Sequence, residues 1–115
     1  MKKITTLFIG ALVLLCTSVS AQQMNKAQAD QKAQQVLNQY QADLELTIEQ
    51  VTDFHHTISM YLLKRNEIEN KAMAPDAQKS ALSAISNEET TKMASILNSH
   101  QLKLYKKLKP KIQPM

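Results

Sequence analysis

Apolar residues recur at steps of three and four along most of this chain, as they do in helices that bury one side. The first such stretch runs from about residue 25 to residue 44, and its stripe consists of Ala33, Val36, Leu37, Tyr40 and Leu44. Residues 75–97 and 102–108 repeat the same spacing. The pattern predicts a helix in each of these three stretches.

The stretch from residue 48 to about residue 73 has the broadest apolar surface. Its main line is Ile48, Val51, His55, Ile58 and Leu62, and Phe54, Met60, Tyr61 and Leu63 add apolar surface around the middle. A helix with one side in water does not need so much. We therefore expect other helices, or a second copy of the chain, to cover this helix.

The segment Leu46-Thr47-Ile48-Glu49-Gln50 has the form of a helix start. The Thr47 hydroxyl suits an N-cap, where it accepts from a backbone N–H of the first turn. Gln50, three residues later, can reach back to the Thr47 N–H and complete a capping box. Leu46 before the cap and Val51 after it can form a hydrophobic staple.

A degenerate copy of this segment, Leu97-Asn98-Ser99-His100-Gln101, follows 51 residues later. We expect Asn98 to be its cap, Gln101 to bond back, and Leu97 to stand where Leu46 stands in the first segment. The chain then consists of two helix–cap–helix units.

Three further signals predict boundaries. Pro75 suits the first turn of a helix. Ser86-Asn87-Glu88-Glu89 has the form of a further capping box and predicts a kink or a restart. The last helix is expected to stop before Pro110, because proline lacks the backbone N–H.

Composition fixes the fold class as all-α. The only glycine is Gly10, so residues 22–115 contain none. Tight hairpin turns usually need glycine, which makes a sheet hard to build from this chain. Ala, Gln, Leu, Lys and Glu are abundant, and all are good helix formers.

The N-terminal residues have the form of a secretory signal peptide. A basic start is followed by an apolar run over residues 7–15 and by Val19-Ser20-Ala21, which suits cleavage after Ala21. The run is too short to span a bilayer, which needs about 20 residues. We expect residues 1–21 to be removed and residues 22–115 to form one domain in the periplasm.

Cys16 is the only cysteine. Lipid attachment would require a small residue before it, and Leu15 is bulky, so we expect no stable membrane anchor. Cleavage after Ala21 would leave a mature chain without cysteine in an oxidising compartment, and hence without disulfides.

Charge is distributed unevenly. Residues 22–89 hold 6 basic and 10 acidic side chains, whereas residues 90–115 hold 6 lysines and no acid. The basic end is either a solvated tail or the complement of the acidic part of a second copy. Nucleic acid is not expected as the partner of an exported protein.

The sequence offers little for catalysis and only a weak case for metal. Without glycine the mature chain cannot build a phosphate-binding loop, and we expect no enzyme. The candidate zinc ligands are His55, His56 and His100, but neighbours on a helix point about 100° apart. A zinc site would have to bridge helices or subunits, with Asp53 or Glu49 adding an oxygen.

Leu46-Thr47-Ile48-Glu49-Gln50 matches the LTxxQ motif of the Spy/CpxP family of periplasmic proteins, and the segment ILNSHQLKLYKKLKP is similar to that family's common ending. The resemblance covers roughly residues 27–110. In the second motif Asn98 replaces threonine and His100 replaces glutamate. The resemblance implies an elongated helical hairpin of about four helices that dimerises antiparallel into a cradle.

The same resemblance implies that the protein holds unfolded envelope proteins without ATP or restrains the periplasmic domain of a sensor kinase. A metal-binding envelope stress protein is the alternative. We expect the client or dimer surface on the second helix, at Phe54, Ile58, Tyr61, Leu62, Lys64 and Arg65. These apolar side chains are either core and dimer contact, or a shallow surface for unfolded segments.

Overall fold

The computed structural model describes residues 24–114, which form four α-helices and contain no strand. They are α2 (Lys26–Leu44), α3 (Ile48–Glu69), α4 (Pro75–Ala94) and α5 (Ser99–Ile112). The all-α prediction is confirmed. The expected signal peptide at residues 1–21, with Cys16 and the cleavage site, lies outside the described residues. Within residues 24–114, no helix is both long and apolar enough to cross a membrane.

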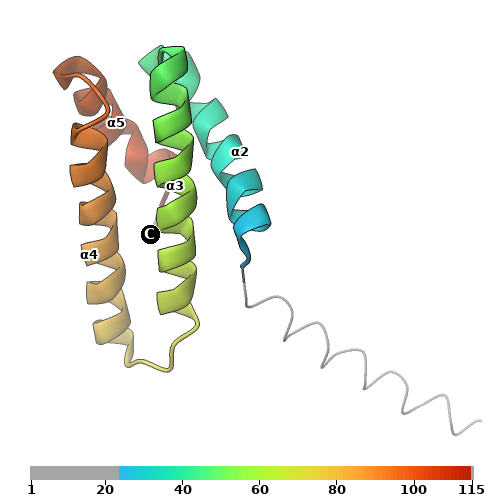
Figure 1. Ribbon diagram of the computed structural model, residues 1–115. Helices are drawn as coiled ribbons and strands as arrows, with labels where there is room; N and C mark the ends of the chain where they lie inside the picture. The colour runs from blue at the N-terminus through green and yellow to red at the C-terminus, as the bar shows by residue number, and fades with distance from the viewer. Residues whose placement is uncertain (1–23, 115) are drawn as a thin grey trace, which may run out of the picture.

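The helices pack in a ring of neighbours. α3 contacts α2 along one side and α4 along the other, and α5 contacts both α2 and α4. In Figure 1, α4 returns alongside α3 after the loop at residues 70–74, and α5 runs behind the ends of the helices that lie far from that loop. Both predicted cap segments, residues 46–50 and 97–101, therefore lie at the same end of the molecule, far from the loop at residues 70–74.

Three aromatic rings form the centre of the core. Tyr40 of α2 lies 5.3 Å from both Phe54 of α3 and Tyr105 of α5, and Phe54 lies 6.1 Å from Tyr105, measured between ring centroids. All three are fully buried, and they pack with Ile58 and Met93. Edge-on and tilted contacts of this kind add to the stability gained by burial. The rings join α2, α3 and α5 at one end of the molecule.

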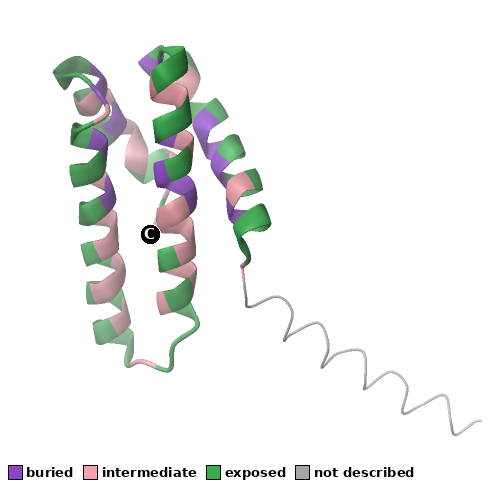
Figure 2. Ribbon diagram, in the orientation of Figure 1, coloured by how far each residue is buried: buried purple, intermediate pink, exposed green. Residues whose placement is uncertain are grey.

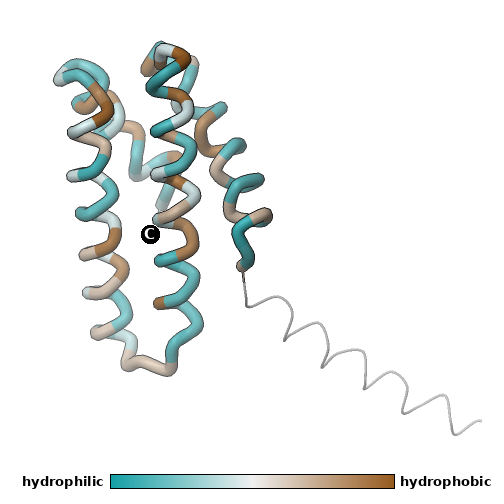
Figure 3. Tube along the Cα trace, in the orientation of Figure 1, coloured by the Kyte–Doolittle hydropathy of each residue, from teal (hydrophilic) through white to brown (hydrophobic). Residues whose placement is uncertain are grey.

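The other end is thin. From residue 60 to residue 88, in the parts of α3 and α4 next to their connecting loop, no residue is buried (Figure 2). Apolar positions nevertheless continue into this region (Figure 3). We call residues 60–88 the open segment.

Two predicted boundaries are wrong. α4 passes through residues 86–89 without interruption, because the Glu89 side chain turns inward to Lys109 and is not used to cap a new helix. α5 continues past Pro110 to Ile112. The residues after the proline gain contacts that offset the missing hydrogen bond: Ile112 packs against the core, and Gln113 bonds to Tyr40 and Glu89.

The predicted apolar line of α3 is also wrong at its first member. Ile48 is 87% exposed, whereas Leu46, two residues earlier, is 7% exposed. Leu46 precedes the cap and enters the core, so the helix begins with Ile48 on its outer side.

Candidate functional site

Both predicted capping boxes are present. At α3 the Thr47 hydroxyl accepts from the Gln50 N–H (3.1 Å), and Gln50 Oε1 accepts from the Thr47 N–H (3.0 Å). At α5 the corresponding distances between Asn98 and Gln101 are 2.8 and 3.0 Å. The preceding residues, Leu46 and Leu97, are buried, as a staple requires.

The two boxes bind each other. Gln50 Nε2 donates to Gln101 Oε1 (2.7 Å), and Gln101 Nε2 donates to Gln50 Oε1 (3.0 Å). Each side-chain amide has a second N–H, which it donates to a backbone carbonyl just before the other capping box. Gln50 Nε2 donates to the carbonyl of Ile96, and Gln101 Nε2 donates to that of Leu44. Every donor and acceptor of both amides is thereby used. We call this arrangement the glutamine pair, and it joins the two helix–cap–helix units.

A buried ion pair joins α4 to α5. Lys109 Nζ lies 2.9 Å from Glu89 Oε1, with the two side chains 13% and 5% exposed. Lys109 also donates to the Ser86 carbonyl and to the Tyr105 hydroxyl. The extra bonds matter, because removing two charges from water costs more than their attraction returns unless the other polar atoms are satisfied.

Gln113 extends this network to α2. Its Nε2 donates to both Glu89 oxygens, and its Oε1 accepts from the Tyr40 hydroxyl at 2.7 Å. Burial, together with the negative charge of Glu89, raises the pKa of Tyr40 and of Tyr105. Both phenols therefore stay protonated at any physiological pH and serve as hydrogen-bonding groups, not as bases.

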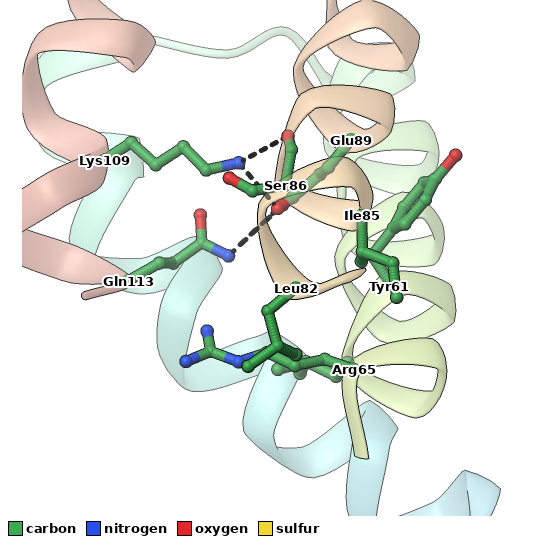
Figure 4. Close-up of a pocket in the computed structure, with 9 residues that line it drawn as sticks. Tyr61, Arg65, Leu82, Ile85, Ser86, Glu89, Lys109 and Gln113 are labelled. Atoms are coloured by element: carbon green, nitrogen blue, oxygen red, sulfur yellow. Dashed lines mark hydrogen bonds and ion pairs between the residues drawn. The ribbon is translucent and has the colours of Figure 1, made fainter. Parts of the chain in front are cut away.

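A small cavity opens beside this network. It is lined by Tyr61, Leu62 and Arg65 of α3, by Leu82, Ile85, Ser86 and Glu89 of α4, and by Lys109 and Gln113, and it has a volume of about 20 Å³. That is room for about one water molecule. In Figure 4 the polar groups of Glu89, Lys109 and Gln113 lie on one side, and Leu82, Ile85 and Tyr61 lie on the other. The apolar side belongs to the open segment.

The predicted binding surface is wrong at two positions. Phe54 and Ile58 are fully buried in the chain's own core, so they are not available to a client or a second copy. The periodicity of α3 could not distinguish a side chain covered by its own chain from one left open.

The other four predicted positions do lie at the surface. Tyr61 and Leu62 are half-buried in the open segment. Lys64 Nζ stands 4.9 Å from the Tyr61 ring centre and 3.7 Å from Glu88. Arg65 pairs with Glu69 at 3.3 Å and donates to the Pro114 carbonyl. Ionic groups thus flank an apolar strip.

The three histidines do not form a common site in residues 24–114. His55 is half-buried, with its Nε2 2.9 Å from the carbonyl oxygen of Asp30, while His56 and His100 are exposed. Within residues 24–114, no cluster of three or more His, Cys, Asp or Glu side chains is placed to hold a metal ion.

The buried network is what sequence reasoning missed. Glu89, Lys109 and Gln113 each looked like surface residues, since most charged side chains are exposed. One signal was available: Tyr105 and Lys109 are four residues apart, so they lie on one face of a helix. Their partner at residue 89 is set by tertiary packing alone.

Comparison with protein-family models, with characterised proteins and with solved structures found no match.

Proposed function

We propose that this protein is an exported binding protein of the Spy/CpxP type, which holds unfolded segments of envelope proteins on its open segment without ATP. The observation that carries the proposal is the open segment itself. It contains nine apolar residues that are half-buried: Met60, Tyr61, Leu62, Leu63, Ile68, Met73, Ala81, Leu82 and Ile85. Tyr61, Leu62, Leu82 and Ile85 line the same cavity, and we call these four the apolar strip. No residue between 60 and 88 is buried, although Leu62 also packs against the core.

Such a surface suits weak binding of many sequences. Unfolded proteins expose apolar stretches, which gain free energy by leaving water at roughly 25 cal/mol per Å². The strip is shallow, so it selects for apolar character more than for shape. Met60 and Met73 favour this, because the methionine side chain adapts to irregular partners.

The rest of the molecule keeps this surface in place. The glutamine pair and the aromatic core fix the ends of the helices far from the loop, and the Glu89–Lys109 pair holds α4 to α5 just above the open segment. A client can therefore contact the open segment without disturbing the core.

We also propose the antiparallel dimer and the hairpin shape that the family resemblance implies, with Tyr61 and Leu62 near the contact. The partly exposed apolar strip supports it. Sedimentation velocity at tens of micromolar tests it. A folded monomer would remove the dimer from the proposal and leave client binding standing.

Aggregation suppression tests the function. A chemically unfolded model protein is diluted into buffer without ATP, and its light scattering is followed with and without this protein. We expect suppression, and we expect Ile85→Ser to weaken it, because Ile85 lies in the strip. Ile48→Ser is the matched control, since Ile48 is exposed at the far end of α3.

Thermal unfolding of both variants must first show that they fold. The proposal fails if the wild-type chain does not suppress aggregation, or if Ile48→Ser weakens suppression as much as Ile85→Ser does.

A further inference from the structure

The outer face of α5 carries four exposed lysines and no acidic residue. The exposed residues of this helix are Ser99, His100, Lys103, Lys106, Lys107, Pro110 and Lys111. Lys103, Lys107 and Lys111 follow each other at steps of four, so they form one row that is about 12 Å long at 1.5 Å per residue. Lys106 lies beside it. We call these four side chains the lysine row.

The charge of the lysine row is not neutralised within the described chain. The ion pairs of residues 24–114 use Lys26, Lys64, Arg65 and Lys109, and none uses a member of the row. No acidic residue occurs between residues 90 and 115. Ionic groups elsewhere on the surface are mixed in sign, as in the pair of Lys64 with Glu88.

The opposite side of α5 is firmly packed. Tyr105 and Gln101 are buried, Leu102, Leu104 and Leu108 pack against the core, and Lys109 is held by Glu89. The helix therefore cannot turn its apolar side outward. Apart from Pro110, the outer face has no apolar side chain that could enter a bilayer.

We propose that the lysine row docks this protein on a membrane surface rich in anionic phospholipid headgroups. Lysines in a row attract such a surface by charge alone, and fluid headgroups can move to meet them without any fixed register. The row has no arginine and no aromatic residue, which proteins use to recognise bases, so nothing in it favours a nucleic acid over headgroup phosphates. A chain exported to the periplasm, as the N-terminal residues predict, would meet phospholipid at membrane surfaces that face the periplasm.

The proposed docking is peripheral and reversible by salt. Without an apolar face to insert, binding depends on electrostatic attraction, which ions screen within about 10 Å at 0.1 M. The lysine row and the open segment share no residue. The inference therefore does not rest on the chaperone proposal, and either can fail alone.

Vesicle co-sedimentation tests the inference. The probes are vesicles of phosphatidylcholine alone and vesicles with an equimolar share of phosphatidylglycerol, mixed with the processed chain. Lys103→Gln/Lys107→Gln removes two charges from the row. Lys71→Gln/Lys79→Gln is the matched control, because it removes two exposed lysines outside α5 for which no ion pair is formed in residues 24–114.

We expect binding to the anionic vesicles only, and its loss at high salt. Each lysine near such a surface contributes about fivefold, so the row variant should bind about 25-fold more weakly. The control variant should bind within a few-fold of wild type.

Several results would overturn the inference. One is no preference for anionic vesicles, and another is an equal loss in both variants, which would indicate net charge without a defined face. A third is unchanged lipid binding in the row variant together with a shift from dimer to monomer in sedimentation, which would assign the row to a second copy. Thermal unfolding of each variant excludes a loss of fold as the cause.

Discussion

Gln101→Glu keeps the size of a buried side chain but removes its amide donor from the glutamine pair. In the wild-type chain Gln101 Nε2 donates to the Leu44 carbonyl (3.1 Å) and to Gln50 Oε1 (3.0 Å). A carboxylate cannot donate, so the Leu44 carbonyl loses its partner and Gln50 Oε1 keeps only its bond from the Thr47 N–H. Both oxygens then face a negative charge. The substitution therefore tests whether the two cap segments hold each other.

The magnitude follows from these contacts. Leaving the buried Leu44 carbonyl unsatisfied costs about 2 kcal/mol, and losing one of the two bonds to Gln50 Oε1 costs about 1 kcal/mol more. The bonds that Gln101 Oε1 accepts, from the Asn98 N–H and from Gln50 Nε2, become charge-assisted and return about 1–2 kcal/mol. We expect a net loss of about 1–2 kcal/mol in the free energy of unfolding, or about 5–15 °C in Tm for a domain of this size.

The chain offers a close control. α2 begins with a third capping box, in which Gln28 Oε1 accepts from the Asn25 N–H (3.0 Å) and, within residues 24–114, Gln28 has no partner on another helix. Glutamate suits this position of an exposed box, and a negative charge in the first turn is favourable. Gln28→Glu should therefore leave Tm unchanged or raise it slightly.

The assay is thermal unfolding followed by circular dichroism at pH 7 and pH 4. The carboxyl introduced at residue 101 is buried and faces the Leu44 and Gln50 oxygens. Burial and these oxygens oppose its ionisation more than its two N–H donors favour it, so its pKa lies above the unfolded value of about 4.3. A carboxyl whose pKa is higher in the folded protein than in the unfolded chain favours folding while it is protonated. That contribution is complete below the unfolded pKa and is lost as the pH rises through the folded pKa. The deficit of Gln101→Glu should therefore be larger at pH 7 than at pH 4. A wild-type Tm in Gln101→Glu at pH 7, or an equal loss in Gln28→Glu, would refute the reasoning.

Two further predictions concern charged side chains that bond to a neighbouring helix, and urea unfolding checks both. Hydrogen bonding from Ser59, and then from Lys26, lowers the pKa of Asp30 from its ordinary 3.8, so the stability that this carboxylate contributes is present above pH 3.8 and is lost as the pH falls below it. The difference in stability between wild type and Asp30→Asn should therefore hold at neutral pH and shrink on acidification. A difference that grows on acidification would contradict the assignment. Lys109→Met should lower the free energy of unfolding by about 3 kcal/mol, because it leaves Glu89 buried without its cation. Adding Glu89→Leu should restore part of that loss. Additive losses would show that the two side chains act independently.

Local signals predicted the helix starts well and their partners not at all. Thr47 and Asn98 were expected to cap helices because capping depends on residues within one turn. That Gln50 would meet Gln101 depends on how four helices close, over a separation of 51 residues. One clue was present: both boxes carry glutamine where glutamate would also cap, and only the amide donates as well as accepts.

The errors have the same origin. Pro110 is a valid local stop signal, but Ile112 and Gln113 find tertiary partners that carry α5 onward. Phe54 and Ile58 fall on the apolar side of α3 as predicted, but periodicity does not say which neighbour covers each position. The chain's own core covers these two, whereas the apolar side chains of residues 60–88 are covered only in part.

Cross-linking from defined positions tests the central claim, that unfolded clients lie on the open segment. Cys16 is the only native cysteine and belongs to the segment expected to be removed, so one introduced cysteine can carry a photoreactive label. Leu82→Cys places the label in the apolar strip, and Gln35→Cys places it on the exposed side of α2. We predict cross-links from residue 82, and not from residue 35, to a model protein when it is unfolded and none when it is folded. Equal cross-linking from both positions, or none from residue 82, would contradict the account.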